Sequence, residues 1–469
     1  MDSDFENRLK ATKKVSLKKS IDFLKRLNIK HEFKIKSEYE TINNISLKLV
    51  KGNRTFKFKM NSFNLVKNMS DQQSEGYGLA KPFEINSAEL GSLILKRGVS
   101  SYSWNLHSDI IEGTIDQLSS KGFDKKPNSY FQAFLPIKDL NSQPNYLVEN
   151  EMLNIDSRII QSGLLEIPIQ GTKFLIYSFQ ENNDYNLVIE NRNSLSCDSF
   201  QKITECISFS LAFISGILLR NELTIISYVD KDFELIDGFY YKVLPDSIYS
   251  GKAIFLSRIP LPKIYDQVNR TLPKEVFEKL ITLCLEEEEV LNSIKIMTQS
   301  NNLPMELIIS SYCVGLEAIK NYITKNLKGV RPIKKPKIAS SIRKKLLNII
   351  NSYDETFFNS RNAILQKINN INQETNTDGF ISAFEKVNYK LSEYDLYCID
   401  LRNKFLHGQI PLHENINHEL TFIIYKLHFL VSVLILKTSG YNGYLLNNVT
   451  YLKVMLNHKK ITEPLFIQV

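Results

Sequence analysis

The sequence has little arginine, few cysteines and a single tryptophan. Only 13 of its 59 basic residues are arginine, so each arginine in a site-like setting is of interest, because the planar guanidinium suits phosphate better than lysine does. The cysteines are odd in number and no two form a Cys-x-x-Cys pair, which argues against a disulfide framework or a zinc knuckle. Reduced thiols in a cytoplasmic protein fit this pattern. The cysteines are Cys197, Cys206, Cys284, Cys313 and Cys398.

The sequence also lacks the segments that direct a chain to a membrane. Its opening residues, MDSDFENRLKATKK, are charged and contain no apolar centre, so we expect no signal peptide. The run that we take as the most apolar, ISFSLAFISGILL at 207–219, has 13 residues. A helix needs roughly 20 apolar residues to span a bilayer, so this run is too short. We therefore expect a buried helix at this run and no membrane partner.

Motifs of several enzyme classes are missing as well. There is no Walker loop, no Gly-x-Gly-x-x-Gly after a strand and no Gly-x-Ser-x-Gly elbow, so nucleotide hydrolysis and esterase chemistry lack support. At 469 residues, with 43% apolar and 23% charged residues, the chain has an ordinary globular composition and is long enough for two domains. Its net charge of +8 is modest but unevenly spread.

Two hairpins are predicted in the first half of the chain. Residues 45–60 alternate apolar and basic side chains on both sides of Gly52-Asn53, a pair that accepts the positive φ angles of a tight turn. Residues 173–190 have the same period of two, with the bend expected at 182–184. The lysines of the first hairpin are of the kind found on the solvent face of a sheet, although they are also suited to touch nucleic acid.

Other elements of the first half are expected around these hairpins. Residues 8–28 form a basic amphipathic stretch, and 198–220 have the pattern of a helix with Asp198 as its N-cap. Strand patterns return at 222–229 and 233–243. The first half is therefore predicted to be rich in strands.

The pattern changes to helical after a proline-punctuated stretch at 258–263. Thr271 is placed as a helix cap, with Pro273 in the first turn, where its missing N–H costs nothing. Further helices are expected at about 303–325, 337–351, 354–371, 377–389, 392–407 and 414–438. We predict an α+β chain with a strand-rich N-terminal domain at 1–262 and an all-α helical bundle at 263–469.

A basic segment lies within the helical half. Residues 325–345 contain nine lysines and arginines and no acidic residue. Such a segment is suited to contact the phosphates of RNA. The alternatives are a solvated loop or a partner for the acidic run Glu286–Glu289. The candidate RNA-binding residues are Lys334, Lys335, Lys337, Arg343, Lys344 and Lys345.

The stretch DLRNKFLHGQIP, residues 400–411, sets an arginine, an asparagine and a histidine at the end of an amphipathic segment. Gly408 is placed to end the helix in the left-handed conformation. In a continuous helix Asn403 and His407 share a face, whereas Arg402 and His407 point about 140° apart. For both to act on one phosphate, the helix has to finish just before His407, or a second chain has to supply part of the site.

Arg402, Asn403 and His407 suit the cleavage of RNA without a metal ion. The attacking 2′-hydroxyl needs a base and the leaving 5′-oxygen needs an acid, and an imidazole can do either near neutral pH. A guanidinium can grip two phosphate oxygens more strongly as charge develops. Asn403 either orients the imidazole or donates to the phosphate. One histidine per chain covers one of the two proton transfers, so two motifs facing each other form a natural arrangement.

The same residues also have a structural interpretation. A cationic side chain in the last turn of a helix is favoured by the helix dipole, and glycine after a helix is common. His407, His413 and His418 suggest a metal site, but their spacings do not place them on one helical face, so we expect no metal. Glu317 is a further candidate to face the motif, although a glutamate on a helix is more often simply exposed.

The residues LRNKFLHG resemble the signature of the HEPN superfamily: an arginine, a polar residue, a few further residues and a histidine, inside an all-helical domain. Many members are metal-independent endoribonucleases that dimerise so that two motifs meet in one cleft. A strand-rich half followed by a helical domain is similar to the ApeA-type anti-phage abortive-infection proteins. The resemblance implies Arg402 and His407 as catalytic residues and Asn403 as the polar position of the motif.

Our hypothesis is therefore a metal-independent endoribonuclease effector without a cofactor, acting on RNA as a homodimer through its HEPN domain. The resemblance implies tRNA as one candidate substrate. It also implies that the N-terminal domain restrains the nuclease or senses a trigger, such as one derived from a phage. Two alternatives stay open: a non-catalytic RNA- or nucleotide-binding HEPN module, and a toxin neutralised by a separately encoded antitoxin.

Overall fold

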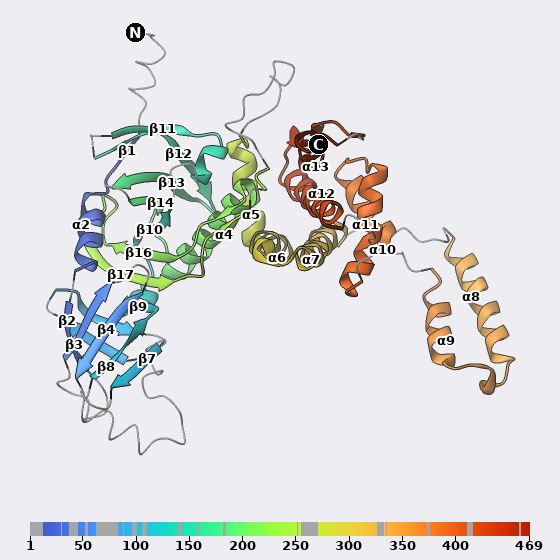
Figure 1. The fold of residues 1–469 in the computed structure, drawn as a ribbon, viewed down its shortest axis with the longest axis horizontal. Coiled ribbons are helices and arrows are strands. Elements are labelled where there is room, and N and C mark those ends of the chain that lie inside the picture. Colours follow the sequence, from blue (N-terminus) through green and yellow to red (C-terminus); the bar gives the residue numbers. More distant parts are fainter. Residues whose placement is uncertain are drawn as a thin grey trace, which may run out of the picture. The chain divides into compact units, whose positions relative to one another are not determined.

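Two compact units make up the chain in the computed structural model (Figure 1). One comprises Met1–Leu261 with Asn269–Leu285, here the sheet unit, and the other comprises Pro262–Val268 with Glu286–Val469, here the helical unit. Together they give the α+β fold that the sequence predicts. The structure describes residues 13–29, 31–36, 46–51, 55–61, 83–87, 89–95, 101–105, 110–138, 143–156, 159–181, 184–250, 252–254, 271–325, 333, 335–372, 376–409, 416–458 and 461–469.

The sheet unit is organised by one sheet of 16 strands among the described residues, in the order β1-β11-β12-β13-β14-β10-β16-β17-β9-β6-β5-β2-β3-β4-β8-β7. Every neighbouring pair is antiparallel except β1 and β11. The strands are β1 (Lys13–Val15), β2 (His31–Lys36), β3 (Ser46–Lys51), β4 (Phe56–Asn61), β5 (Phe83–Ser87), β6 (Gly91–Leu95), β7 (Ser101–Asn105), β8 (Ile110–Ile115), β9 (Gln117–Ser120), β10 (Tyr130–Ile137), β11 (Glu151–Ile155), β12 (Ile159–Ile169), β13 (Thr172–Glu181), β14 (Asp184–Asn191), β16 (Glu222–Tyr228) and β17 (Ile236–Val243). A separate short pair joins β15 (Ile217–Leu218) to β18 (Ile248–Tyr249).

Both predicted hairpins are confirmed. β3 pairs with β4, and β13 pairs with β14, each antiparallel. Successive side chains of β4 point to opposite faces of the sheet, so Phe56 and Phe58 are buried while Lys57 and Lys59 are exposed. The expected turn residues 52–53 and 182–183 lie outside the described residues.

Residues 207–215 of the apolar run lie in a buried helix, as predicted, but the helix expected at 198–220 ends at Ser215, and Ile217–Leu218 form β15 instead. Helix α4 (Cys197–Ser215) has 13 buried residues out of 19. Its N-cap is Ser196 and not Asp198, because the Ser196 hydroxyl accepts from the backbone N–H of Ser199. Asp198 lies instead in the first turn, where its negative charge is favourable to the helix dipole.

Helix α5 (Lys274–Glu286) belongs to the sheet unit, although the boundary predicted at 262/263 assigns it to the helical half. Leu272 forms a bridge with Val148 just before the helix, and Lys274 donates to Glu151 at 3.0 Å. The helical stretch that begins after Pro273 is divided into two helices, because Glu287 adopts an extended conformation between α5 and α6.

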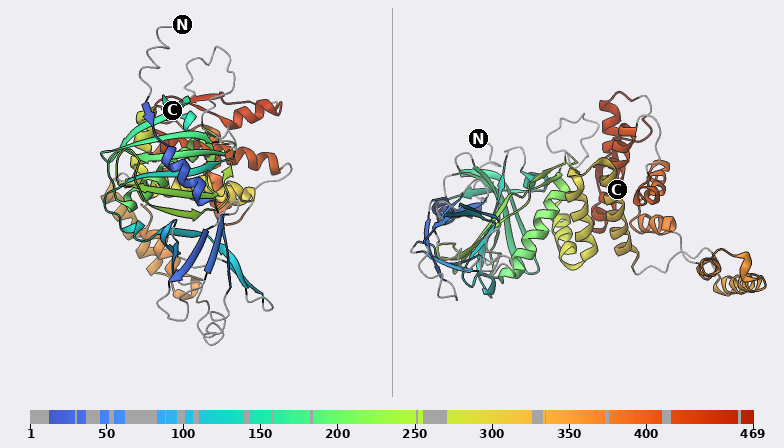
Figure 2. Two further views of the ribbon diagram at one scale, coloured as in Figure 1. Left: turned by 90° about the vertical axis from the view of Figure 1, so that its left-hand side faces the viewer. Right: turned by 60° about the horizontal axis from the view of Figure 1, so that its bottom comes forward.

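Helix α2 (Lys18–Leu27) lies against the sheet (Figure 2), and a buried polar network attaches it there. The Ser20 hydroxyl contacts Gln132 on β10 and lies 2.7 Å from the Tyr228 hydroxyl on β16. Gln132 and Tyr177 each donate to Glu190 on β14 at 2.8 Å. Burial raises the pKa of Glu190, against the neighbouring Arg192 charge and these hydrogen bonds, which lower it. The network holds the helix in register on the sheet.

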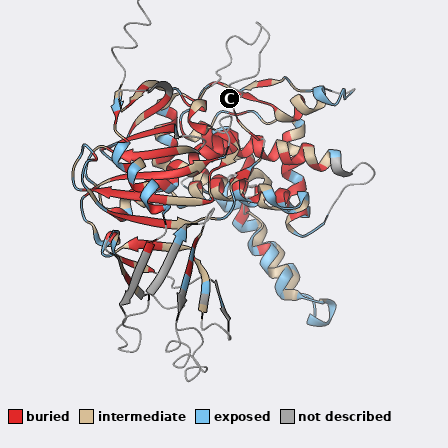
Figure 3. Ribbon diagram, turned by 60° about the vertical axis from the view of Figure 1, so that its left-hand side comes forward, coloured by how far each residue is buried: buried red, intermediate tan, exposed pale blue. Residues whose placement is uncertain are grey.

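The helical unit is built around α12, which packs against α7, α11 and α13, while α6 and α10 pack against α7. Figure 3 shows buried positions in the helices as well as in the sheet. Its helices are α6 (Glu288–Gln299), α7 (Met305–Thr324), α8 (Pro336–Asn351), α9 (Arg361–Asn369), α10 (Asn376–Lys386), α11 (Glu393–Leu406), α12 (Ile416–Thr438) and α13 (Asn448–Met455). A short antiparallel pair of β19 (Tyr444–Leu446) and β20 (Phe466–Gln468) brackets α13 in the chain.

Helix α12 is more apolar than α4, the helix that contains most of the run expected to be the most apolar. Its residues His418–Thr438 are long and apolar enough to cross a membrane by length and hydropathy alone. However, 83% of that stretch is buried inside the structure. The apolar character of α12 is therefore that of a core helix packed on all sides.

Candidate active site

The motif residues lie at the C-terminal end of α11, whose two ends are firmly defined. At its start, Ser392 and Asp395 form a capping box, each side chain accepting from the backbone N–H of the other. At its end, His407 is the C-cap and Gly408 has a φ of 72°. Gly408 donates to Phe405 and Gln409 donates to Lys404, the two bonds of a Schellman motif. The helix thus finishes just before His407, as the motif requires.

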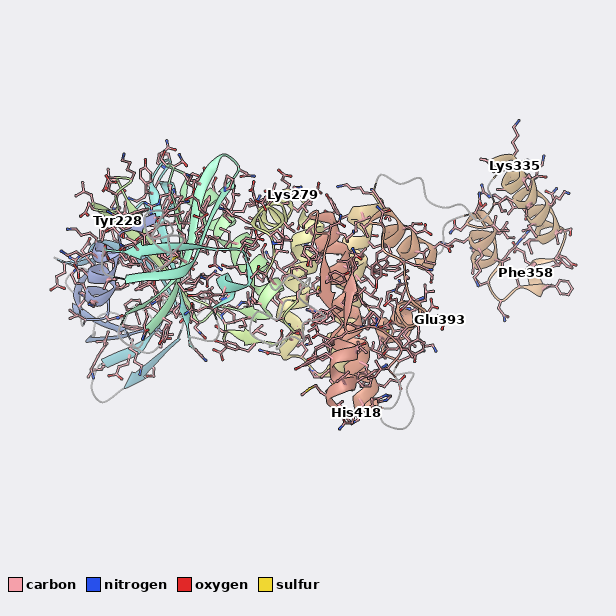
Figure 4. The ribbon with its side chains drawn as sticks, turned by 90° about the horizontal axis from the view of Figure 1, so that it is seen from above. Tyr228, Lys279, Lys335, Phe358, Glu393 and His418 are labelled. Carbon is pink, nitrogen blue, oxygen red and sulfur yellow. The ribbon has the colours of Figure 1, made fainter. Side chains whose placement is uncertain are left out.

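A buried ionic cluster fixes the start of α11 against α12. Figure 4 marks Glu393 at the start of α11 and His418 near the start of α12. Lys426 of α12 is fully buried and lies 2.9 Å from Asp395 and 2.7 Å from Glu463. Glu463 also accepts from Ser392 at 2.7 Å. The capping box, α12 and the C-terminal segment are therefore locked together, which sets the position of the motif helix.

Arg402 points into the helical unit and not to its surface. Its side chain is 1% exposed, and its guanidinium carbon lies 4.4 Å from the centre of the Phe380 ring on α10. Its Nε lies 3.4 Å from the Glu317 carboxylate on α7. Its Nη2 donates to Asn403 Oδ1 at 2.9 Å. The arginine therefore joins α7, α10 and α11 behind the motif.

The hydrogen-bonding capacity of this guanidinium is incompletely used. Among the described residues, neither Nε nor Nη1 of Arg402 has a hydrogen-bond partner. Buried donors without partners are costly, so the arginine retains capacity for an anion. A phosphate does not reach these nitrogens in the observed conformation, because the side chain is covered. The predicted grip of Arg402 on phosphate therefore requires α10 and α11 to move apart, or the arginine acts through its neighbours.

Asn403 and His407 form the exposed part of the motif. Both side chains are exposed, one helical turn apart, as their spacing predicts. Because Arg402 donates to the Oδ1 atom of Asn403, that amide is oriented with its oxygen inward and its Nδ2 donor group away from the arginine. The structure thus exposes Asn403 and His407 one turn apart, whereas Arg402 is buried and reaches the exposed part of the motif through its bond to Asn403.

Two residues at the site were not assigned firmly from the sequence. Glu317 was one candidate among several, and its ion pair with Arg402 places it at the motif. Phe380 had no sequence signal, since a phenylalanine in a helix is most often a core residue. Cys313 lies near Arg402, but burial raises the pKa of its thiol to about 12. That thiol is therefore excluded as a nucleophile near neutral pH.

The candidate RNA-binding residues lie elsewhere, on and just before α8. Lys335, Lys337, Lys344 and Lys345 are exposed, and Arg343 is half-buried. Lys334 lies outside the described residues. The alternative partnership with the acidic run is seen at Lys325, which lies 3.9 Å from Glu287.

Metal ligation finds no support in the described part of the chain, where no group of three or more histidine, cysteine, aspartate or glutamate side chains could hold an ion. His407 and His418 are exposed, and His413 lies outside the described residues. A separate hollow of about 620 Å³ at the C-terminal ends of α7, α10 and α12 is lined by Lys386 and Lys437, and it does not include the motif residues.

Comparison of the chain with models of known families, with curated proteins and with solved structures finds no match. The resemblance to HEPN proteins therefore depends on the motif residues and their helical setting.

Proposed function

We propose that this chain is a metal-independent endoribonuclease of the HEPN type. The observation that carries the proposal is the end of α11, where Asn403 and His407 are exposed one turn apart and the buried Arg402 donates to Asn403. A proton-transfer group, a neutral donor and a nearby cation are the groups that a phosphodiester transfer needs.

In the proposed reaction the ribose 2′-hydroxyl is the nucleophile. A base removes its proton while O2′ attacks phosphorus, and the bond from phosphorus to O5′ breaks as an acid protonates that oxygen. The products are a 2′,3′-cyclic phosphate and a free 5′-hydroxyl. His407 supplies one of the two proton transfers, and the Asn403 amide donates to a non-bridging oxygen.

Arg402 has a positioning role in the resting conformation. Its hydrogen bond orients Asn403, and its positive charge lies next to the residue that would contact the developing negative charge. Glu317 and Phe380 hold the guanidinium in place. An opening of the seam between α10 and α11 would add direct contact with phosphate through Nη1, which has no protein partner among the described residues.

The second proton transfer needs a second histidine, which a homodimer supplies if two α11 ends face each other. We place the protein in the cytoplasm, acting on RNA with tRNA as one candidate, in anti-phage abortive infection. The sheet unit then restrains the nuclease or senses a phage-derived trigger. These elements of the proposal depend on the resemblance to ApeA-type proteins. Co-purification of a small protein partner would favour an antitoxin instead.

A non-catalytic RNA-binding module is the second candidate, and the burial of Arg402 favours it. In that case Arg402 serves helix packing, and Gly408 and His407 only terminate α11. The exposed lysines of α8 would then carry the binding.

Incubation of the purified full-length chain with total RNA in excess EDTA tests the proposal. His407→Ala is the main variant, alongside Arg402→Ala. The matched control is His418→Ala, which removes another exposed histidine of the same unit. Cleavage that persists in EDTA, falls about 10²–10⁴-fold with His407→Ala and is retained with His418→Ala supports the enzyme. Equal decay of RNA in wild type and all three variants would refute the nuclease and support the non-catalytic RNA-binding module.

A further inference from the structure

Helices α8 and α9 form a hairpin whose surface is almost entirely open (Figures 3 and 4). The two helices pack on each other, and only Ala339 and Ile368 within them are buried. Figure 4 marks Lys335 before α8 and Phe358 past the turn. At the base, the Asn372 side chain accepts from the backbone N–H of Ile333 at 2.7 Å. The hairpin is therefore a defined element with a closed base.

The turn of the hairpin is ordered by its own polar contacts. Asp354 accepts from the backbone N–H and the hydroxyl of Thr356, each at 3.0 Å. Arg361 donates to Glu355 at 3.1 Å and to Asn351 at 2.9 Å. These bonds tie the start of α9 to the end of α8. The turn thus presents its remaining side chains from a fixed backbone.

Two aromatic rings lie exposed on this turn. Tyr353 is 55% exposed and Phe357 is 75% exposed, the largest value among the large hydrophobic side chains that the structure describes. The ring centres are 6.4 Å apart and the rings are inclined at 75°. Two neighbouring aromatic rings exposed to water are unfavourable in a protein surface that binds nothing, so we take this pair as a candidate binding site. Rings exposed to this extent offer surface on which a base can stack.

The hairpin as a whole is positively charged, with most of its cations along α8 and its two acidic residues, Asp354 and Glu355, at the turn. Residues 335–372 contain seven lysines and arginines against two acidic residues. Along α8, Lys337, Ser341, Lys344 and Asn348 recur at helical spacing and share the face opposite the apolar stripe. Cations interspersed with hydroxyl and amide groups are the side chains that contact the phosphates and sugars of nucleic acids. The polar face of α8 leads toward the aromatic turn.

We infer that the α8–α9 hairpin is a binding arm for single-stranded RNA, with the polar face of α8 following the backbone and Tyr353 and Phe357 stacking on unpaired bases. The choice of RNA rests on the proposed function. If the hairpin binds in this way, the substrates of the proposed nuclease are RNAs with unpaired bases, such as a loop or a single strand. Stacking on rings and contact with phosphate together are the usual means of holding such strands.

RNA fits the hairpin better than a bilayer or a protein partner does. Helix α8 packs on α9, with Ala339 and Ile368 buried and most other apolar residues of α8 half-buried, so the stripe is not presented to a membrane as one fully open face. The excess of positive charge is complementary to phosphate. A protein interface of ordinary composition would be depleted of lysine at its centre.

The test measures binding apart from cleavage. The full-length chain with His407→Ala is titrated with a fluorescent single-stranded oligoribonucleotide and with a fully paired duplex of the same length, in EDTA, at several salt concentrations. Three further variants are made in that background: Tyr353→Ala with Phe357→Ala, Lys337→Ala with Lys344→Ala, and Ile349→Ala. Ile349 is 52% exposed on the same hairpin and serves as the matched apolar control.

We expect the aromatic double variant to weaken binding of the single strand on the order of tenfold or more, with little effect on the duplex. The lysine double variant should weaken both and reduce the salt slope by about 0.7 per lost phosphate contact to the single strand. Ile349→Ala should bind as the parent does. Unchanged single-strand affinity in the aromatic variant, with its fold intact by circular dichroism, overturns the inference.

Two further measurements separate the alternatives. A loss of binding to phosphatidylserine vesicles in the aromatic variant, without loss of RNA binding, would overturn the inference in favour of a membrane. A change of oligomeric state in that variant by light scattering, again with RNA binding retained, would overturn it in favour of a second copy. Aromatic-dependent RNA binding by a chain whose wild type does not cleave RNA would support the arm while refuting the nuclease.

Discussion

The guanidinium carbon of Arg402 lies 4.4 Å from the centre of the Phe380 ring, and both side chains are buried. A cation held against a ring away from water gains about 2 kcal/mol or more. This contact places the charge of the motif inside the helical unit, where it joins α10 to α11. The motif arginine is therefore a structural element as well as a candidate for the reaction.

Replacement of Arg402 should destabilise the protein. Arg402→Ala removes a large buried side chain and leaves Glu317 without its cation, so we expect a loss of about 2–4 kcal/mol in the free energy of unfolding. Urea denaturation followed by circular dichroism measures it. Lys404→Ala, an exposed change two residues later, is the control and should cost less than about 0.5 kcal/mol. Equal midpoints for the two variants would contradict the burial of Arg402.

Asn403→Asp should change stability and activity in opposite directions. A carboxylate at this position strengthens the hydrogen bond that Arg402 Nη2 makes to Asn403, because charged acceptors bind more strongly than neutral ones. It also adds negative charge where the phosphate is proposed to bind. We expect a small rise in the unfolding midpoint and a loss of RNA cleavage of at least tenfold. An active Asn403→Asp enzyme would exclude Asn403 from phosphate contact.

Gly408→Ala should loosen the end of α11. Nothing lies within 4 Å of an added Cβ, so the cost comes from the φ of 72° alone, about 1 kcal/mol. Because Gly408 follows His407 directly, cleavage should fall together with stability. Gly408→Asn, which tolerates this conformation better, should recover part of both losses in the same assays. Identical behaviour of the two variants would show that the left-handed conformation is unimportant.

Loss of the Glu463 carboxylate should make stability less dependent on pH. Burial acts to raise the pKa of Glu463, but the charge and hydrogen bonds of Lys426, with those of Ser392 and Asn447, hold the pKa below its ordinary value of 4.5. A lowered pKa in the folded state means that the carboxylate stabilises the fold above about pH 4.5, and that this contribution disappears as the pH falls through the folded-state pKa.

Glu463→Gln should therefore cost about 3 kcal/mol at pH 7 and progressively less in acid. Denaturation of both proteins between pH 3 and 7 measures the difference. A constant gap across that range would contradict the ion pair between Glu463 and Lys426.

Much of the local structure could be predicted from the spacing of apolar, polar and glycine residues in the sequence. The period of two around Gly52-Asn53 predicted β3 and β4, and the spacing from Asn403 to Gly408 predicted both a shared exposed face and the helix end. These features depend on neighbouring residues, whose backbone preferences and side-chain directions act over one or two turns.

Only the folded chain settled where Arg402 points and which unit holds α5. Arg402 is buried because Glu317 and Phe380, on helices far apart in the sequence, meet around it. Helix α5 joins the sheet unit because Leu272 bridges to Val148 and Lys274 pairs with Glu151. Helical periodicity shows which side of a helix is apolar, but the neighbour that covers it is chosen by contacts between distant segments, which no local pattern contains.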